Sequence, residues 1–444
     1  MEMDEVDPGL KALYLQRRLL PHEAVQTIAG CKNLILGMSA AQPPALMAAT
    51  ADALKDRLIG PLAIYYLHGT ESLRRSLLVP ELSDRVIPRP LFLSHSDRAA
   101  IAQSGSQSWI EFVPAMLHQA GRLLTEHIDP ECFFVTVSPM DRHGYFSLGT
   151  NADYGASVIR KAKKVIVEVN RYMPRTFGEC SVHISEIDHL VEHDEPLIEA
   201  IPNPPTAVDM KIAEQIVQRI NDGDTLQIGV GGVPNAVLAG LTNHQNLGLH
   251  SELFSPAMMP LIQSGVMNGR RKTWMQHKHV FTFALGDRAL YDFLDDNPSI
   301  VGYPASWVNN PDIIRLNDNM VSVNSALEID LTGQINSEQL GDRPFSGSGG
   351  QLDFVRGAYS ARNGRSFVAL RSTAQSDKVS RIVPRLLGGT VTDPRNDVHF
   401  VVTEHGCVNL KGLSIPQRAR ALIDIAAPEF REALEREAIS MGLV

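Results

Sequence analysis

The stretch Thr225-Leu-Gln-Ile-Gly-Val-Gly-Gly-Val-Pro234 carries the pattern that decides the fold. Its first four residues, which alternate between polar and apolar side chains, predict a short β-strand, and the glycines after them predict a turn. A helix is expected before the strand, over residues 207–220, and another after the turn, beginning near Asn235. This order of helix, strand, glycine turn and helix is typical of an α/β fold with mostly parallel sheets.

The same order of elements occurs earlier in the chain. Residues 33–36 predict a strand, Gly37-Met-Ser-Ala-Ala-Gln-Pro-Pro44 a turn, and residues 45–58 a helix. Further buried strands are expected over residues 62–67, 132–137 and 164–169, each a nearly continuous apolar run.

A second pair of similar segments follows in the same order. Val137-Ser-Pro-Met-Asp-Arg-His-Gly144 and Val323-Asn-Ser-Ala-Leu-Glu-Ile-Asp-Leu-Thr-Gly333 both combine a strand end, an acidic residue and a glycine turn. Two pairs of similar segments that occur in the same order predict two related α/β halves. We interpret a proline-rich segment between the two halves as a linker. It is Glu195-Pro-Leu-Ile-Glu-Ala-Ile-Pro-Asn-Pro-Pro-Thr206, which holds four prolines. We therefore predict domains at residues 1–200 and 207–444.

Composition excludes several classes of protein. The chain has 444 residues, enough for two or three domains, and 41 basic against 50 acidic residues give a formal charge of −9. This balance argues against a nucleic-acid partner, so any anionic ligand must be bound by local groups. No apolar stretch is long enough to span a membrane, the first residues lack the pattern of a secretory signal, and the four cysteines are widely spaced. We expect a cytoplasmic protein with reduced thiols.

The glycine cluster Gly229 to Gly232 is a candidate anion site. Glycines between a strand and a helix let the backbone approach a ligand and direct amide N–H groups at it. The cluster is not a dinucleotide fingerprint, because Pro234 occupies the position of the third glycine, and no Walker phosphate loop is present. A plain tight turn is the competing interpretation. The second cluster, Phe345-Ser-Gly-Ser-Gly-Gly-Gln351, offers similar amides or is a flexible surface loop.

Glu252 is the candidate reactive carboxylate. It lies among Leu249, Leu253 and Phe254, and desolvation there would raise its pKa. A helix cap or a surface charge is the commoner role for a glutamate, so Glu252 depends on its context. The run Gly269-Arg-Arg-Lys272 could meet phosphates, although such runs more often form a solvated face.

One metal motif is rejected. His189-Leu-Val-Glu-His193 matches the H-x-x-E-H pattern of inverted zinc proteases, but Asp194-Glu-Pro196 follows at once and would end the long helix that such a site needs. We therefore predict no metal site. No G-x-S-x-G nucleophile elbow is present either.

Taken together, the motifs resemble the acetyl-CoA hydrolase/transferase family, and within it the branch of the 4-hydroxybutyrate and butyryl-CoA:acetate CoA-transferases. The resemblance covers residue 37 to the C-terminus. In the second half it rests on five ordered segments: Gly229-Val-Gly-Gly-Val-Pro234, His250-Ser-Glu-Leu-Phe-Ser255, Asn324-Ser-Ala-Leu-Glu-Ile-Asp330, Gly347-Ser-Gly-Gly-Gln-Leu-Asp-Phe-Val-Arg-Gly-Ala358 and Val402-Thr-Glu-His-Gly406. In the first half it rests on Gly37-Met-Ser-Ala-Ala-Gln-Pro-Pro44, Val137-Ser-Pro-Met-Asp-Arg-His-Gly144 and Val167-Glu-Val-Asn-Arg-Tyr-Met-Pro-Arg175.

The resemblance implies two NagB/RpiA-like CoA-transferase domains, the second carrying a nucleophilic glutamate at Glu252. It also implies a set of CoA-binding positions: Ile228, Gly229, Val230, Gly231, Gly232, Leu327 and Gly350. The implied activity is transfer of CoA between short-chain carboxylic acids through a glutamyl-CoA thioester, with ping-pong kinetics. Acyl-CoA and small carboxylic acids would be the substrates, with no permanently bound cofactor, and the protein would be a homo-oligomer.

Two other functions stay open at this point. In a thioester hydrolase, water would replace the acceptor acid, and the family name covers both activities. A non-catalytic protein that binds CoA or a sugar phosphate could use the same fold. Relatives often have His-Thr-Glu-Met where this chain has His250-Ser-Glu-Leu253, so the acyl specificity is also open.

Overall fold

The computed structural model describes residues 6–103, 109–201 and 203–444. The chain divides into two compact units: the first comprises Met1–Ala200 and Phe281–Trp307, and the second Ile201–Val280 and Val308–Val444. Of the proline-rich linker, Pro202 lies outside the described residues. The domain limits at residues 1–200 and 207–444 stay a prediction.

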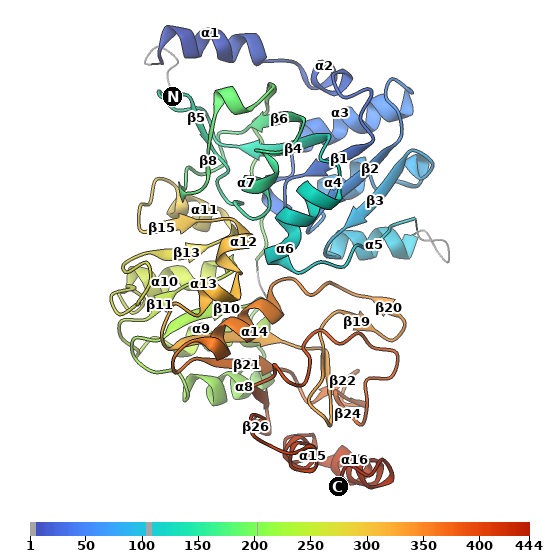
Figure 1. The fold of residues 1–444 in the computed structure, drawn as a ribbon, viewed down its shortest axis with the longest axis vertical. Coiled ribbons are helices and arrows are strands. Elements are labelled where there is room, and N and C mark those ends of the chain that lie inside the picture. The colour runs from blue at the N-terminus through green and yellow to red at the C-terminus, as the bar shows by residue number, and fades with distance from the viewer. Residues whose placement is uncertain (1–5, 104–108, 202) are drawn as a thin grey trace. The chain divides into compact units, whose positions relative to one another are not determined.

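The first unit is built on a parallel sheet. Among the described residues it has six strands in the order β3-β2-β1-β4-β6-β9, and every neighbouring pair is parallel (Figure 1). The strands are β1 (Asn33–Leu36), β2 (Leu62–Tyr66), β3 (Val86–Pro90), β4 (Cys132–Val137), β6 (Lys164–Val169) and β9 (His189–Glu192). Most of their residues are buried, as expected where a parallel sheet is covered by helices.

The helices of the first unit follow the predicted pattern. They are α1 (Pro8–Arg17), α2 (Pro21–Gln26), α3 (Pro44–Lys55), α4 (Glu71–Ser76), α5 (His95–Gln103), α6 (Leu117–Arg122), α7 (Gly155–Val158) and α11 (Arg288–Leu294). Helix α3 ends three residues before the predicted limit at residue 58. Arg57 adopts a left-handed backbone conformation with φ 57°, which a helix cannot include.

The second unit has a closely related sheet. Its order is β11-β10-β16-β21-β25-β26, and among the described residues the pairing is parallel except between β25 and β26. The strands are β10 (Thr225–Ile228), β11 (Gly248–Leu249), β16 (Met320–Ser325), β21 (Arg365–Ala369), β25 (Phe400–Thr403) and β26 (Gly406–Asn409). The helices around them are α8 (Ala207–Val217), α9 (Gly232–Gly240), α10 (Met259–Gln263), α13 (Pro311–Ile314), α14 (Gln351–Ser360), α15 (Ile415–Asp424) and α16 (Pro428–Ser440).

The start of α9 differs from the expectation. The helix begins at Gly232, before the predicted position near Asn235. Gly231 precedes it with φ 125°, a conformation that favours glycine, and Pro234 lies in the first turn, where its missing N–H costs no helical hydrogen bond.

Strand order confirms that the two halves are related. The order β2-β1-β4-β6-β9 matches β11-β10-β16-β21-β25, so β1 corresponds to β10 and β4 to β16. The two pairs of similar sequence segments lie at the ends of these same strands. The predicted fold class, two related α/β halves with mostly parallel sheets, is therefore confirmed.

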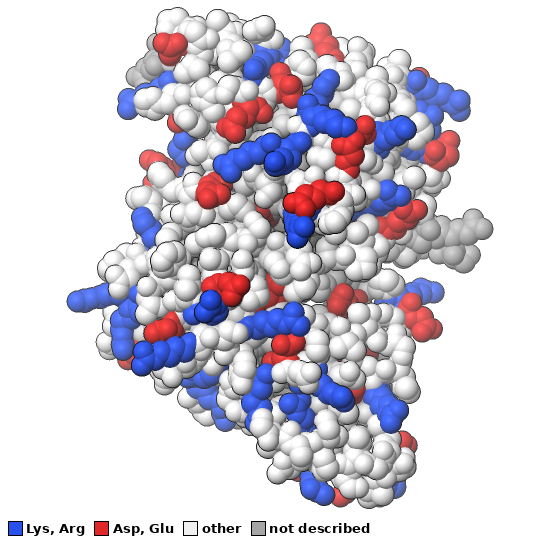
Figure 2. Space-filling model, in the orientation of Figure 1, with Lys and Arg blue, Asp and Glu red and all other residues white. Residues whose placement is uncertain are grey.

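The surface mixes charges of both signs. On the face shown in Figure 2, Lys and Arg side chains are interspersed with Asp and Glu, in keeping with the modest net charge of −9. Within the described residues, no helix combines the length and apolar character needed to cross a membrane.

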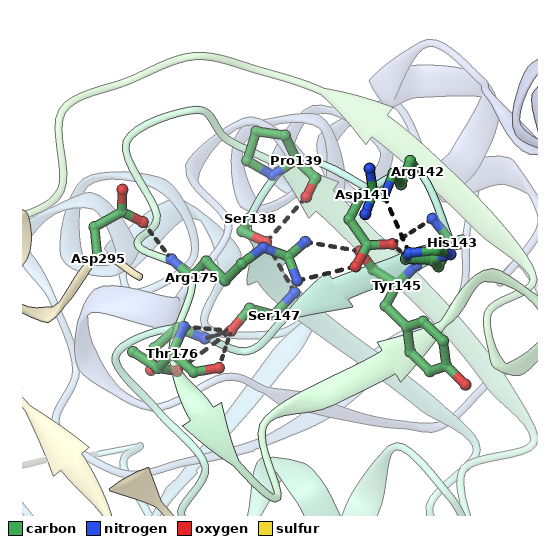
Figure 3. Close-up of polar contacts among 11 residues, drawn as sticks. Ser138, Pro139, Asp141, Arg142, His143, Tyr145, Ser147, Arg175, Thr176 and Asp295 are labelled. Atoms are coloured by element: carbon green, nitrogen blue, oxygen red, sulfur yellow. Dashed lines mark hydrogen bonds and ion pairs between the residues drawn. The ribbon is translucent and has the colours of Figure 1, made fainter. Parts of the chain in front are cut away.

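The motif at Val137 to Gly144 forms a polar network in the first unit (Figure 3). Asp141 accepts hydrogen bonds from the backbone N–H groups of His143 and Tyr145, at 2.8 and 2.9 Å, and pairs with Arg175 at 3.1 Å. The backbone N–H of Arg175 donates to Asp295 at 2.7 Å. The network joins two of the motifs that carry the family resemblance.

We predict that Asp141→Ala lowers the stability of the protein by about 2 kcal/mol, because two backbone donors and a half-buried guanidinium lose their acceptor. Asp141→Asn keeps an oxygen for the backbone donors and should cost less than half as much. The matched control is Asp292→Ala, which breaks the exposed pair with Arg288 and should cost less than about 0.5 kcal/mol. Thermal unfolding measures all three, and equal losses for Asp141→Ala and Asp292→Ala would contradict the prediction.

Candidate active site

The candidate residues gather at the carboxyl ends of three neighbouring strands in the second unit. The glycine loop follows β10, Glu252 comes three residues after β11, and Leu327 comes two residues after β16. Open parallel sheets bind ligands at this edge, where the strand order reverses. Here the order reverses at β10, whose neighbours on either side are β11 and β16.

The glycine loop is anchored at both ends. Ile228 is fully buried as the last residue of β10, and the Gly229 N–H donates to the Val323 carbonyl at 2.9 Å. Gln227 and Asn324 exchange two side-chain hydrogen bonds of 3.1 Å between β10 and β16. At the helix end, a Cβ on Gly232 would lie 2.4 Å from the Asp209 carboxylate, so a larger residue there must displace Asp209 from its bonds to Thr206 and Arg371.

Between these anchors the loop faces outward. Val230 is 69% exposed, and Gly231 is exposed as well. The first N–H groups of α9 have no partner within the helix, and the helix dipole gives this end a partial positive charge. The loop is thus suited to an anionic group.

The Glu252 carboxylate is held by donors from two other segments. Asn309 Nδ2 donates to Glu252 Oε2 at 2.6 Å, and the backbone N–H of Gly350 also donates to the carboxylate. Asn309 is fully buried, whereas Glu252 keeps part of its surface exposed. Burial and the nearby Asp353 raise the pKa of Glu252 to about 7, against the opposing effect of the two donors. The direction of this shift is the one expected from the apolar neighbours of Glu252 in the sequence.

Gly350 approaches Glu252 so closely that no side chain fits. A Cβ at Gly350 would lie 1.8 Å from Glu252 Oε2 and 2.0 Å from Asn309 Nδ2. Gly350 caps the N-terminus of α14, whose dipole adds positive potential at the carboxylate. The structure therefore brings Glu252 and Gly350 into contact. Leu327 lies on the adjacent strand end, where its N–H donates to the Asn336 carbonyl at 2.9 Å.

Sequence reasoning missed Asn309 and Asp353. Asn309 lies in Val308-Asn-Asn-Pro311, a composition typical of a turn or a helix cap, and Asn310 does cap α13. Asp353 lies within the motif Gly347 to Ala358, where nothing in the pattern singles it out. No local pattern shows that either residue lies near Glu252, because both contacts depend on chain segments at least 57 residues away.

The basic run at residues 269–272 is only partly solvated: Arg270 and Arg271 are exposed, as a solvated face requires, whereas Lys272 is buried. Lys272 is 1% exposed, and its Nζ donates to the carbonyls of Leu249 and Lys278 at 2.9 and 2.8 Å. Lys272 is therefore neither a solvated charge nor available to a phosphate.

The rejected zinc motif forms a strand. His189 to Glu192 make up β9 and His193 follows directly, so the two histidines, four positions apart, lie about 13 Å from each other along an extended chain. In the part of the chain that the structure describes, no three His, Cys, Asp or Glu side chains are grouped to hold a metal.

Comparisons with known proteins identify the family. The model of the acetyl-CoA hydrolase/transferase N-terminal domain matches residues 3–202, and that of the C-terminal domain matches residues 286–438. A succinyl-CoA:cyclohexane-1-carboxylate CoA transferase of Geobacter metallireducens is 44% identical, over 80% of this chain and 80% of its own. The chain belongs to the acetyl-CoA hydrolase/transferase family.

Two further similar proteins match about three quarters of the chain or more. The 4-hydroxybutyrate coenzyme A transferase of Clostridium kluyveri is 45% identical over 74% of this chain and 77% of its own. The crystal structure of RipA from Yersinia pestis has a TM-score of 0.94 at 44% identity, and covers 98% of this chain and 100% of its own. The family and the enzyme class expected from the sequence, a CoA-transferase, are thereby confirmed.

We predict that Gly350→Ala lowers kcat/KM by roughly 100-fold, because the added methyl group must displace both Glu252 and Asn309. Gly30→Ala is the matched control, since a Cβ there meets nothing within 4 Å. Steady-state CoA transfer and the melting temperature should be measured together. Wild-type kcat/KM in Gly350→Ala would show that the close contact with Glu252 has no part in the reaction.

Proposed function

We propose that this protein transfers CoA from an acyl-CoA to a short-chain carboxylic acid, with Glu252 as the nucleophile. The observation that carries the proposal is the Glu252 carboxylate, which has a raised pKa and is held by Asn309 and Gly350 beside the glycine loop. Burial raises the pKa of Glu252 to about 7, so its carboxylate is a stronger nucleophile than that of an ordinary glutamate.

The first half-reaction exchanges CoA for the carboxylate. A Glu252 oxygen attacks the thioester carbonyl, the carbon–sulfur bond breaks, and an acyl-glutamyl anhydride forms with release of CoA thiolate. The thiolate then attacks the Glu252 carbonyl carbon, and the anhydride bond breaks. The products are a glutamyl-CoA thioester and the free carboxylate of the donor acid.

The second half-reaction reverses these steps with another acid. The acceptor carboxylate attacks the glutamyl thioester and expels CoA thiolate, which then attacks the acceptor carbonyl of the new anhydride. A new acyl-CoA leaves, and the Glu252 carboxylate is restored. Because one acid leaves before the next one enters, the kinetics are ping-pong.

Each addition produces a tetrahedral oxyanion that needs hydrogen-bond donors. The Gly350 N–H and the Asn309 amide already face the Glu252 carboxyl group, so they can stabilise an oxyanion formed on its carbon. For CoA itself we propose the positions Ile228, Gly229, Val230, Gly231, Gly232, Leu327 and Gly350. CoA enters as a substrate, and the proposed cycle uses no permanently bound cofactor.

Several finer points belong to the same proposal. The acids named for the relatives include 4-hydroxybutyrate and cyclohexane-1-carboxylate, which supports a monocarboxylic acid as one partner in transfer. We also propose a cytoplasmic homo-oligomer with domains at residues 1–200 and 207–444. In the hydrolase alternative, water would attack the glutamyl thioester in place of the acceptor acid.

We predict that incubation with succinyl-CoA, butyryl-CoA or acetyl-CoA, without an acceptor, leaves CoA attached to Glu252 as a thioester. Intact-protein mass spectrometry detects the adduct, and borohydride reduction followed by peptide mapping locates it. Glu252→Gln should form no adduct and should lose at least roughly 1,000-fold in transfer, because it removes the nucleophile.

Glu168→Gln is the matched control. Glu168 is also a buried glutamate whose pKa burial raises to about 7, but it accepts the N–H of Leu46 in the first unit. This variant should keep both the adduct and the transfer activity. Full activity in Glu252→Gln, or an adduct on another residue, would refute the proposed nucleophile, and release of free CoA at the same rate with and without acceptor acids would favour the hydrolase.

A further inference from the structure

His250, two residues before the proposed nucleophile, is buried in an unusual setting. Its side chain is fully inaccessible to solvent, and its Nε2 lies 2.8 Å from the Val308 carbonyl oxygen. A carbonyl oxygen can only accept, so Nε2 carries the proton in this hydrogen bond. Burial and the neighbouring Lys272 lower the pKa of His250 to about 3, so the imidazole is neutral and donates from a fixed tautomer.

The imidazole ring is fixed by its surroundings as well as by this bond. It meets the Phe354 ring edge-on, with 6.3 Å between centroids, and Phe354 belongs to α14. The His250 backbone N–H donates to the Leu226 carbonyl at 3.0 Å, which ties this residue to β10. His250 therefore offers a rigid donor to the Val308 carbonyl.

The acceptor of that bond immediately precedes the amide that holds Glu252. Val308 is the last residue of α12 (Ala305–Val308), and Asn309 follows it directly. On the other side, Asn310 caps α13 by accepting the Asp312 N–H at 2.9 Å. Helix α13 packs on α14 so closely that a Cβ at Gly357 would lie 2.6 Å from Ile314. Asn309 is thus a single residue between two fixed points, one of which is the bond to His250.

We infer that His250 is a positioning residue for the proposed reaction, acting through Val308 and Asn309 to hold the Glu252 carboxylate in its reactive place. The chain of contacts runs from His250 Nε2 to the Val308 carbonyl, along one peptide to Asn309, and from Asn309 Nδ2 to Glu252 Oε2. This inference rests on the proposed function of Glu252. It assigns His250 no contact with substrate.

A double-mutant cycle tests the inference. The rate of glutamyl-CoA formation is measured by rapid quench, with whichever of succinyl-CoA, butyryl-CoA and acetyl-CoA reacts fastest with the wild type. We expect Asn309→Ala to slow this step about 100-fold, because it removes a hydrogen bond to a charged group. His250→Leu should slow it about 10-fold, because it removes a hydrogen bond to a neutral carbonyl. The double variant should be at most about 2-fold slower than Asn309→Ala, because both substitutions interrupt the same chain of contacts.

Two further variants separate positioning from folding. His250→Gln can place an amide N–H where Nε2 lies, so its rate should return to within about 3-fold of the wild type. His279→Leu is the matched control, because His279 is also a buried histidine whose pKa is lowered by burial and by Lys272. Its effect should be independent of Asn309, so that the losses multiply in the double variant.

The outcomes distinguish the inference from the proposed function. Multiplying losses for His250→Leu and Asn309→Ala, or a His250→Gln variant as slow as His250→Leu, would overturn the role of His250 and leave the nucleophile intact. If His250→Leu does not fold, His250→Asn, whose amide ends short of the Nε2 position, takes its place in the cycle. Wild-type rates in Glu252→Gln would instead overturn the proposed function itself.

Discussion

The hydrogen bond from Asn309 to Glu252, together with the Gly350 N–H, is the interaction on which the site depends. Burial favours the protonated carboxyl group, whereas the two donors favour the carboxylate, and the balance leaves a pKa of about 7. Without the donors the pKa would be higher and less of the group would be ionised, and without the burial it would be an ordinary weak nucleophile. The absence of a side chain at Gly350 follows from the same requirement, since any Cβ would occupy the space of both partners.

This balance opposes folding at neutral pH. In the unfolded chain Glu252 ionises at its ordinary pKa of about 4.5, whereas the folded protein holds the proton up to a pH of about 7. The folded state therefore loses stability relative to the unfolded state as the pH rises from about 4.5 to 7, and the loss is constant above that. The rest of the second unit compensates for it.

Parallel strands place the glycine loop, Glu252 and Leu327 at one edge, and the Gln227–Asn324 pair holds β10 to β16 there. The first unit repeats the strand order, but at the position of Glu252 after the matching strand β2 it has Gly69, so the duplicated fold did not duplicate the carboxylate.

Much of this architecture was predictable from local pattern. The strands at residues 33–36, 132–137, 164–169 and 225–228 have the predicted limits. The runs at residues 132–137 and 164–169 are nearly continuously apolar, which is typical of strands covered by helices on both faces. Helix limits were less accurate: α3 ends at Lys55 because Arg57 is left-handed, which composition does not reveal. Glu252 was found through its apolar neighbours and the family motifs. Asn309, Lys272 and the role of His250 could not be found in this way, because their significance lies in contacts between segments far apart in the sequence.

The central claim is that Glu252 is a carboxyl group with a pKa near neutrality. The most direct test is a ¹³C NMR titration of the protein labelled at the glutamate side-chain carboxyl carbon, with the Glu252 signal assigned by its loss in Glu252→Gln. The account predicts an inflection near pH 7 for this one signal. An inflection at the ordinary value of about 4.5 would show that the carboxyl group is fully hydrated and would contradict the account.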